Sequence, residues 1–289
     1  MTNRILFLLI LSLLTMQRID AQAPVFNASR EDSNAPRQYR PLTAILGAFP
    51  PELVLLQAQL QQKKDTVIQH IHFTEGLLNG RQVVIAQTGI GKVNAAITTT
   101  LLLDHFRPRE IVFTGIAGGI NPDLSPGDLV IGTEVTYHDY GTITPDSMKR
   151  RATRNPFTML ENPEFFPSDT TLVAAAIAAG KNITLEKING KSGSRLPHII
   201  TGIIVTGDVF VASTSATQHL RSRLRADATE MEGAAVAQAC WQQKTPFIVI
   251  RSLSDDAGNN ASADVRNFYE IAARNSASLV IALMEKMAK

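Results

Sequence analysis

Short apolar runs alternate along the chain with longer segments whose apolar residues recur at helical spacing. The short runs, rich in Val, Ile and Leu, predict strands at 42–46, 82–87, 110–115, 128–136, 202–207, 228–230 and 247–253. The longer segments predict helices at 52–62, 92–106, 169–179, 215–223, 233–244 and 263–289. Strands that alternate with helices are typical of a mostly parallel sheet covered by helices on both faces. We therefore expect an α/β fold whose ligand site lies beyond the carboxyl ends of the strands.

The start of the chain has a different pattern. Arg4 precedes an almost unbroken apolar run at 5–16, and small residues around Ala21 suit cleavage, so residues 1–21 are predicted to be a secretory signal peptide. A membrane anchor is the alternative, but the run is shorter than the roughly 20 residues of a spanning helix. We therefore expect an exported protein, periplasmic or secreted, without stable membrane insertion after cleavage.

The remainder of the chain divides into a leader and one domain. Residues 22–40 are polar and lack periodicity, which is typical of a flexible leader. Residues 41–289 have the length of one large α/β domain. The single cysteine, Cys240, lies in an apolar helical pattern and is expected to be a buried small hydrophobe with no internal disulfide.

Charge excludes one class of partner. The chain has 28 basic and 26 acidic residues, for a net charge of +2, whereas a nucleic-acid-binding protein would concentrate basic residues on one face. Only Lys149, Arg150 and Arg151 form a local basic cluster. We interpret it as a solvated charged loop in preference to a specific anion site. The sequence predicts no nucleic-acid partner.

Glycine-rich motifs follow two of the expected strands. The motif at 88–92 lacks the spacing of a phosphate-binding P-loop, and the motif at 114–119 lacks that of a dinucleotide fingerprint. His70 and His72 alternate along an expected strand and do not form a closed set of metal ligands. His138 is interpreted as structural. We expect no metal and no cofactor.

Carboxylates gather at the ends of the last strands. Glu230 and Glu232 precede a helix of small residues, and Asp255 ends the next strand, close to Arg251. Carboxylates among residues otherwise suited to burial are typical of a site that grips a polyol and protonates a leaving group. The chain is therefore interpreted as an enzyme.

Eight motifs in a fixed order carry a family resemblance. The chain from residue 42 to the C-terminus resembles the nucleoside phosphorylase and nucleosidase superfamily, most closely its 5′-methylthioadenosine/S-adenosylhomocysteine nucleosidases. The resemblance implies a nucleoside phosphorylase-like three-layer α/β/α sandwich around a twisted, partly barrel-like mixed sheet. It also implies a homodimer that cleaves the N-glycosidic bond of a purine nucleoside. The motifs are Gly47–Glu52, Thr88–Val93, Thr114–Gly119, Pro126–Val130, Tyr137–Asp139, Thr206–Phe210, Glu230–Glu232 and Arg251–Asp255.

The resemblance assigns the chemical steps to four residues. Asp255 matches the acid that protonates purine N7, so that the base leaves neutral from an oxocarbenium-like sugar. Such an acid needs a pKa raised by a desolvated site. Glu52 matches the residue that activates the attacking water, and Thr88 and Arg251 would help to hold that water.

Four further residues match positions that bind the nucleoside. Glu232 would accept hydrogen bonds from the ribose hydroxyls, and the Met231 thioether would lie against the sugar. Phe210 would stack on the purine, while backbone groups of Val211 would read its edge. The expected partner is thus a small-molecule nucleoside.

Several alternatives remain open on the residues alone. Glu52 could be an early helix residue favoured by the helix dipole after two prolines, and Glu230 could serve only as a helix cap. Asp256 follows Asp255 directly, so the identity of the acid is less secure than its neighbourhood. A nonenzymatic binding or storage protein is a second hypothesis, against which the joint retention of Glu52, Glu232 and Asp255 argues.

Hydrolysis and phosphorolysis differ in the acceptor that the site must bind. A phosphate dianion needs bidentate charge-assisted partners such as arginine. The segments at 47–52 and 111–113 contain no arginine, and Glu52 would repel phosphate. We favour the hydrolase over a phosphate-dependent phosphorylase. The loops at 142–168 and 187–198 are not mapped by the resemblance, so the 5′-substituent and even the base stay open.

Overall fold

The computed structural model describes residues 42–145, 147–190 and 193–288. The expected signal peptide and leader, at 1–21 and 22–40, lie outside the described residues. Within the described part, no helix is both long and apolar enough to cross a membrane.

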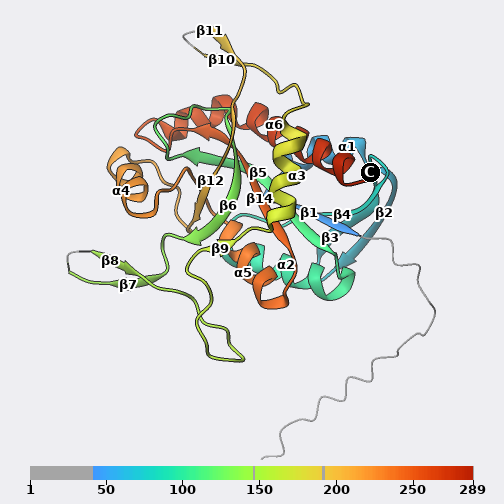
Figure 1. The fold of residues 1–289 in the computed structure, drawn as a ribbon, viewed down its shortest axis with the longest axis horizontal. Helices are drawn as coiled ribbons and strands as arrows, with labels where there is room; N and C mark the ends of the chain where they lie inside the picture. Colours follow the sequence, from blue (N-terminus) through green and yellow to red (C-terminus); the bar gives the residue numbers. More distant parts are fainter. Residues whose placement is uncertain (1–41, 146, 191–192, 289) are drawn as a thin grey trace, which may run out of the picture. The chain divides into compact units, whose positions relative to one another are not determined.

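One large mixed sheet organises the domain (Figure 1). Its strands follow the order β13-β12-β6-β14-β5-β1-β4-β3-β2, and β9 pairs with β6. Because β13 also pairs with β5, five of the strands form a closed ring, which is the partly barrel-like form that the resemblance implied. The strands are β1 Thr43–Gly47, β2 Gln61–Ile68, β3 Ile71–Leu78, β4 Arg81–Gln87, β5 Glu110–Gly119, β6 Leu129–Tyr137, β9 Phe166–Pro167, β12 Ile199–Thr206, β13 Ala228–Glu230 and β14 Phe247–Asp255.

Parallel and antiparallel pairing are balanced in this sheet. Five ladders are parallel: β1 with β4, β1 with β5, β5 with β14, β6 with β12 and β12 with β13. Five are antiparallel: β2 with β3, β3 with β4, β5 with β13, β6 with β14 and β6 with β9. Parallel ladders therefore do not outnumber antiparallel ones among the described strands, in contrast to the expected mostly parallel sheet.

Helices cover both faces of the sheet. Successive side chains of a strand point to opposite faces, and Ala44 and Leu46 accordingly join the core cluster of α2 and α5, whereas Ile45 joins that of α1, α3 and α6. Figure 1 shows the two helix groups on either side of the strands. The helices are α1 Pro50–Gln59, α2 Lys92–Phe106, α3 Thr170–Gly180, α4 Thr214–Leu224, α5 Gly233–Gln243 and α6 Ala261–Ala288.

The elements expected from periodicity are all present; α2 and β13 have the expected bounds, and the others have shifted ends. The first helix was expected to continue to residue 62, but it ends at Gln59, because Leu60 adopts an extended conformation and leads into β2. The strand expected at His70 and His72 corresponds to β3, which contains His72 and follows His70 in the turn, but β2 and its hairpin with β3 were not expected. Most side chains of β2 are exposed, so this edge strand lacks the apolar alternation by which strands are found. Two small hairpins complete the described elements: β7 Gly141–Ile143 with β8 Met148–Arg150, and β10 Ile188–Gly190 with β11 Gly193–Arg195.

Candidate active site

Glu52 lies in the first turn of α1, where its carboxylate turns back toward the end of the sheet. The helix begins at two prolines, whose fixed φ suits a first turn. The buried carboxylate accepts hydrogen bonds from the backbone N–H groups of Ala48 and Phe49, and from that of Ile116 at 2.8 Å. Burial raises the pKa of Glu52, while Arg251 and these donors oppose the rise. Glu52 is therefore both a helix residue and a link to β5.

Arg251, on β14, forms a buried ion pair. It is 1% exposed, its Nη2 donates to Glu230 Oε2 at 2.6 Å, and its guanidinium carbon lies 4.0 Å from the centroid of the Phe113 ring. Burial alone would lower the pKa of Arg251, but the carboxylates around it, Glu230 first and then Glu52 and Glu232, raise it. The guanidinium thus counters the charge of several acids at once.

Glu230 supports the start of α5. Besides Arg251, its Oε2 accepts from the backbone N–H groups of Glu232 and Gly233, at 3.1 and 2.7 Å. Its other carboxylate oxygen accepts from the Thr206 hydroxyl. Glu230 therefore accepts from N–H groups at the start of α5, as a cap would, but it also pairs with Arg251 and does not serve only as a cap. Glu232 is the other acid of this motif.

Glu232 does not cap its own helix. Its Oε1 instead accepts from the backbone N–H of Gly91, at 2.7 Å. Gly89 and Gly91 have φ of +82° and +94°, a region that side chains disfavour, so the glycine motif forms the turn that presents this N–H. Burial raises the pKa of Glu232 most, and the nearby Glu230 carboxylate raises it further. Arg251 and the Gly91 N–H oppose this rise.

Asp255 ends β14 and is 1% exposed. Its Oδ2 accepts from the Ser254 hydroxyl and its Oδ1 from the Ala257 N–H, both at 2.7 Å. Burial raises the pKa of Asp255 to about 6, although these hydrogen bonds oppose the rise. Asp256, by contrast, is exposed and bonds to the N–H of Gly258 within a turn. The structure therefore favours Asp255 as the acid.

Strand β5 sets the distance between the positions of Glu52 and Asp255. Its register pairs Gly115 with Arg251 and Gly118 with Asp255. A methyl group at Gly115 would lie 2.2 Å from Glu52 Oε1, and one at Gly118 would lie 3.0 Å from Asp255 Oδ1. Three residues of strand span roughly 10 Å. The carboxylates of Glu52 and Asp255 thus lie close against the two ends of a glycine-rich stretch of backbone, where larger residues would collide with them.

The other expected site residues differ in their burial and contacts. Thr88 is buried, and its hydroxyl donates to the Gly89 carbonyl at 2.9 Å. Met231 is half-buried. Phe210 is 52% exposed, whereas Val211 packs against a small core cluster beside α4. The polar residues are therefore held in place by the protein, and the Phe210 ring is free to meet a ligand.

One network at the site was not expected from the sequence. Lys92 Nζ donates to both oxygens of Asp139, at 2.6 and 2.7 Å, and lies 3.6 Å from Asp208 Oδ2. Asp208 in turn accepts from the Lys92 N–H and donates its own N–H to Asp139, both at 2.8 Å. The network joins the loops after β4, β6 and β12. All three residues belong to the family motifs, but nothing in their spacing indicates that they meet.

The fold and these residues define the class of the protein. The family model of the phosphorylase superfamily matches residues 43–285, and the chain belongs to that family. Among its relatives, the 5′-methylthioadenosine/S-adenosylhomocysteine nucleosidase of Psychromonas ingrahamii is 40% identical over 237 residues, which cover 82% of this chain and 95% of the relative.

Solved structures agree with this assignment. The 5′-methylthioadenosine/S-adenosylhomocysteine nucleosidase of Neisseria meningitidis, in complex with methylthio-immucillin-A, is 34% identical with a TM-score of 0.73, and the match covers 84% of this chain and 98% of that one. The futalosine hydrolase of Helicobacter pylori is 26% identical with a TM-score of 0.69, and the match covers 84% and 97%. The nucleoside phosphorylase-like fold is thereby confirmed.

Proposed function

We propose that this protein hydrolyses the N-glycosidic bond of purine nucleosides such as 5′-methylthioadenosine or S-adenosylhomocysteine, releasing adenine and the 5-substituted ribose. The observation that carries the proposal is the set of three buried carboxylates, Glu52, Glu232 and Asp255, each with a raised pKa and each at an end of the sheet. Perturbed acids gathered at one site are typical of catalysis. The two nucleosidases described above act on 5′-methylthioadenosine and S-adenosylhomocysteine, according to their names.

Asp255 is proposed as the general acid. A pKa of about 6 leaves part of the population protonated near neutrality. The proton passes to purine N7, the bond between N9 and C1′ breaks with its electron pair moving to the base, and the sugar acquires oxocarbenium character. The Ser254 hydroxyl and the Ala257 N–H hold the carboxyl group in place and stabilise the carboxylate that remains.

Glu52 is proposed to activate the water that attacks C1′. The water loses a proton to the carboxylate as its oxygen bonds to the anomeric carbon, which completes hydrolysis. Burial raises the pKa of Glu52 and so makes it a stronger base once ionised. Because Arg251 already pairs with Glu230, we propose that it offsets the negative charges of the site and does not bind the water. Thr88 is proposed to line the position of the water.

Binding of the nucleoside is assigned to the remaining residues. Glu232, held by Gly91, would accept hydrogen bonds from the ribose hydroxyls, and Met231 would lie against the sugar. The exposed Phe210 ring would stack on the purine, with the Val211 backbone at its edge. Around this site the sheet and its two helix groups support the expected three-layer α/β/α sandwich.

Water is favoured over phosphate as the acceptor. The guanidinium beside Glu52 is that of Arg251, which is buried and already paired with Glu230. A phosphate dianion placed here would be repelled by the Glu52 carboxylate, and Arg251 would not be available to bind it because it already pairs with Glu230. Phosphorolysis is therefore the second candidate.

The decisive experiment incubates the protein with methylthioadenosine, adenosylhomocysteine, adenosine and inosine, with and without phosphate, followed by chromatography of base and sugar. Free adenine and methylthioribose without phosphate support the hydrolase. Strict phosphate dependence with a sugar 1-phosphate product would establish the phosphorylase instead. Tight binding without turnover would replace the enzyme by a binding or storage protein.

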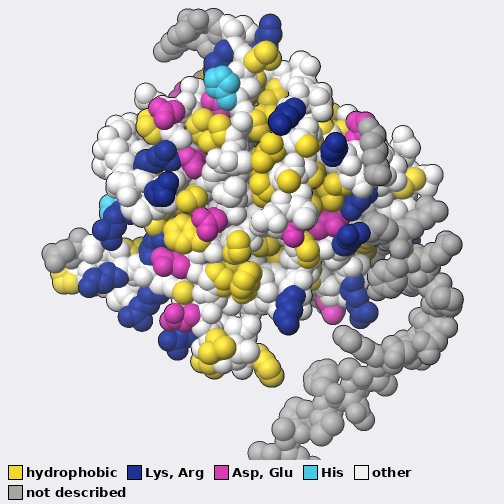
Figure 2. Space-filling view, viewed as in Figure 1, with side chains coloured by type: hydrophobic (Ala, Val, Ile, Leu, Met, Phe, Trp, Pro, Cys, Tyr) yellow, Lys and Arg dark blue, Asp and Glu magenta, His cyan; other side chains and the backbone are white. Residues whose placement is uncertain are grey.

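We also propose that the protein forms a homodimer. Ile90, Val93 and Ile97 are between 50% and 69% exposed and follow helical spacing at the start of α2. Phe157, Met159 and Leu160 are exposed in the loop between β8 and β9, where Figure 2 shows hydrophobic side chains at the lower edge. Clustered exposed apolar residues favour association. Val93→Glu should shift the mass measured by light scattering from dimer to monomer, whereas Val67→Glu on β2 should not.

Export is proposed from the predicted signal peptide. The proposal is supported by the charge and apolar run at the start of the sequence. Expression of the full chain in a bacterium, followed by mass spectrometry of the product in each cell fraction, tests it. An intact N-terminus in the cytoplasmic fraction alone would contradict export.

A further inference from the structure

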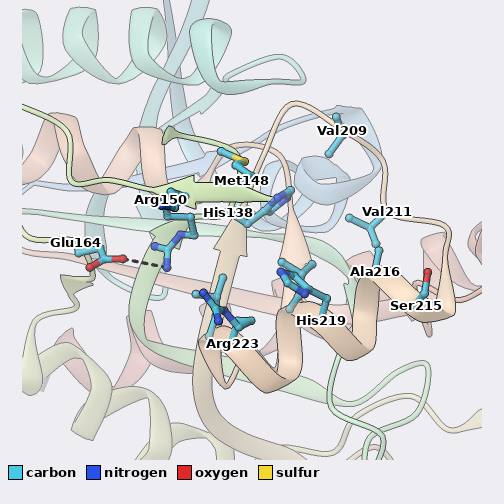
Figure 3. A pocket seen from close by; sticks show the side chains of 13 residues that line it. His138, Met148, Arg150, Glu164, Val209, Val211, Ser215, Ala216, His219 and Arg223 are labelled. Carbon is cyan, nitrogen blue, oxygen red and sulfur yellow. Dashed lines mark ion pairs between the residues drawn. The ribbon is translucent and has the colours of Figure 1, made fainter. Parts of the chain in front are cut away.

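A cavity of about 670 Å³ lies beside α4, next to the loop that carries Phe210. Figure 3 shows His219 and Arg223 on the side of α4, facing His138, Met148 and Arg150 on the opposite side. The lining includes none of Glu52, Glu232, Arg251 and Asp255. Cavities of roughly 300 to 1,000 Å³ are typical of small-molecule sites. This cavity is therefore large enough to hold a ligand of its own.

The lining carries an excess of positive charge. The lining contains three cationic side chains, Lys149, Arg150 and Arg223, and one carboxylate, that of Glu164. Arg150 is already satisfied, because it pairs with Glu164 at 3.1 Å and donates to the Tyr137 carbonyl at 2.6 Å. Lys149 and Arg223 have no ion-pair partner among the described residues. Two cations of the cavity thus remain available to an anion.

The basic cluster of the sequence is divided by the fold. Lys149 and Arg150 of β8 line the cavity, whereas Arg151 does not. Arg223 reaches the same cavity from α4, more than seventy positions later in the chain. The charges of a solvated loop would point into solvent, away from other charged elements. Here basic residues of β8 and α4 line the same concave surface. That convergence favours the anion site, which was the less favoured interpretation of the sequence.

Apolar side chains complete the wall. Val209 and Val211 lie on either side of Phe210 in the loop before α4, and Leu220 and Leu224 come from the helix. A charged group at the basic side would therefore leave the rest of a ligand against hydrocarbon. Guanidinium groups match carboxylate and phosphate with paired hydrogen bonds. The chemistry of the cavity suits an anion that has an apolar body.

We propose that this cavity binds a small organic anion, with its carboxylate or phosphate at Lys149 and Arg223 and its apolar body against Val211 and Leu220. The site goes beyond the proposed nucleosidase activity and does not depend on it. Because Val209 and Val211 flank Phe210, an occupied cavity would also stabilise the loop assigned to the purine.

Calorimetric titration of the full chain with benzoate, phenyl phosphate and benzyl alcohol tests the proposal. The three probes share one aromatic body and differ in charge. Titrations are run with and without saturating adenine, so that binding at the purine position is recognised by competition. We expect one anion per chain that adenine does not displace, bound at least about tenfold more tightly than the alcohol. The tighter of the two anions identifies the preferred charged group.

Variants locate the bound anion. Arg223→Glu and Lys149→Glu change exposed side chains of the lining, one from α4 and one from β8, and each should weaken anion binding at least about tenfold while nucleoside cleavage is retained. Lys63→Glu, an exposed lysine of β2, makes the same charge change away from the cavity and should bind as the wild type does. Equal binding of benzyl alcohol, absence of anion binding up to about 10 mM, or unchanged affinity in both cavity variants would each overturn the proposal.

Discussion

Arg251 donates to Glu230 at 2.6 Å, and both side chains are almost completely enclosed. The pair joins β14 to the start of α5 and lies beside Glu52 and Glu232, whose negative charges the guanidinium also offsets. An arginine that resembled a direct ligand for water is therefore better described as the counter-charge that lets three carboxylates share one buried site.

Removal of the guanidinium should destabilise the protein strongly. Arg251→Met leaves Glu230 buried without its cation, a change that typically costs about 3 to 5 kcal/mol. Thermal unfolding should show a large fall in Tm, and the double variant Arg251→Met with Glu230→Gln should lose less than the sum of the two single variants. Additive losses would show that the two side chains do not act as a pair.

Replacement of the proposed acid should remove turnover without removing the fold. Asp255→Asn cannot donate a proton to purine N7, so kcat should fall by about two to four orders of magnitude. Asp256→Asn is the matched control, because that carboxylate is exposed and bonded within its own turn. Initial rates of adenine release measure both. A greater loss in the Asp256 variant would reassign the acid.

The raised pKa of Asp255 predicts a pH-dependent stability. The folded protein holds this proton up to about pH 6, whereas a free Asp loses it near 3.8, so ionisation of Asp255 lowers stability as pH rises between these values. The cost is absent below about pH 4, fully present above about pH 6, and of the order of 3 kcal/mol. Asp255→Asn lacks it. Urea unfolding at several pH values should show that the free energy of unfolding of the variant rises relative to that of the wild type between about pH 4 and pH 6. A difference that does not change with pH would contradict the raised pKa of Asp255.

Glu232→Gln tests recognition of the sugar. The amide keeps the shape of the side chain but replaces one acceptor oxygen by a donor, so the hydrogen bonds from the Gly91 N–H and from two ribose hydroxyls cannot all be retained. We expect kcat/KM to fall by about 10- to 1,000-fold. Binding of free adenine, measured by calorimetry, should be nearly unchanged because adenine has no ribose. Near-wild-type kcat/KM would exclude Glu232 as the ribose ligand.

Lys92 is predicted to position the loops around the site without touching the substrate. Lys92→Met removes the ammonium from both aspartates and leaves the loops after β4, β6 and β12 less firmly joined. Gly91, next to Lys92, holds Glu232, so kcat should fall about tenfold or more as that carboxylate loses its orientation. Asp139→Asn should have a similar effect, and the two changes together should not be additive. Lys64→Met, an exposed lysine on β2, is the control.

The sequence by itself determined the helices and most of the strands, and it predicted the acidic residues of the proposed site. Periodic burial in α2 and α4 depends on neighbours along the chain, so it can be read from the sequence directly. The order of the motifs around Glu52, Glu232 and Asp255 carries the family resemblance. Strand β2, and with it the hairpin to β3, was not predicted because an exposed edge strand has no apolar alternation.

Tertiary structure decided which partner each charged group meets. Arg251 pairs with Glu230, Lys92 bridges Asp139 and Asp208, and Arg223 shares a cavity with Lys149. These partners come from different strands and loops, which the register of the sheet brings to one edge. Burial and pKa follow from the same packing, because desolvation depends on everything that surrounds a group. The spacing of residues along the chain therefore predicts neither the partners of the charged groups nor their burial and pKa.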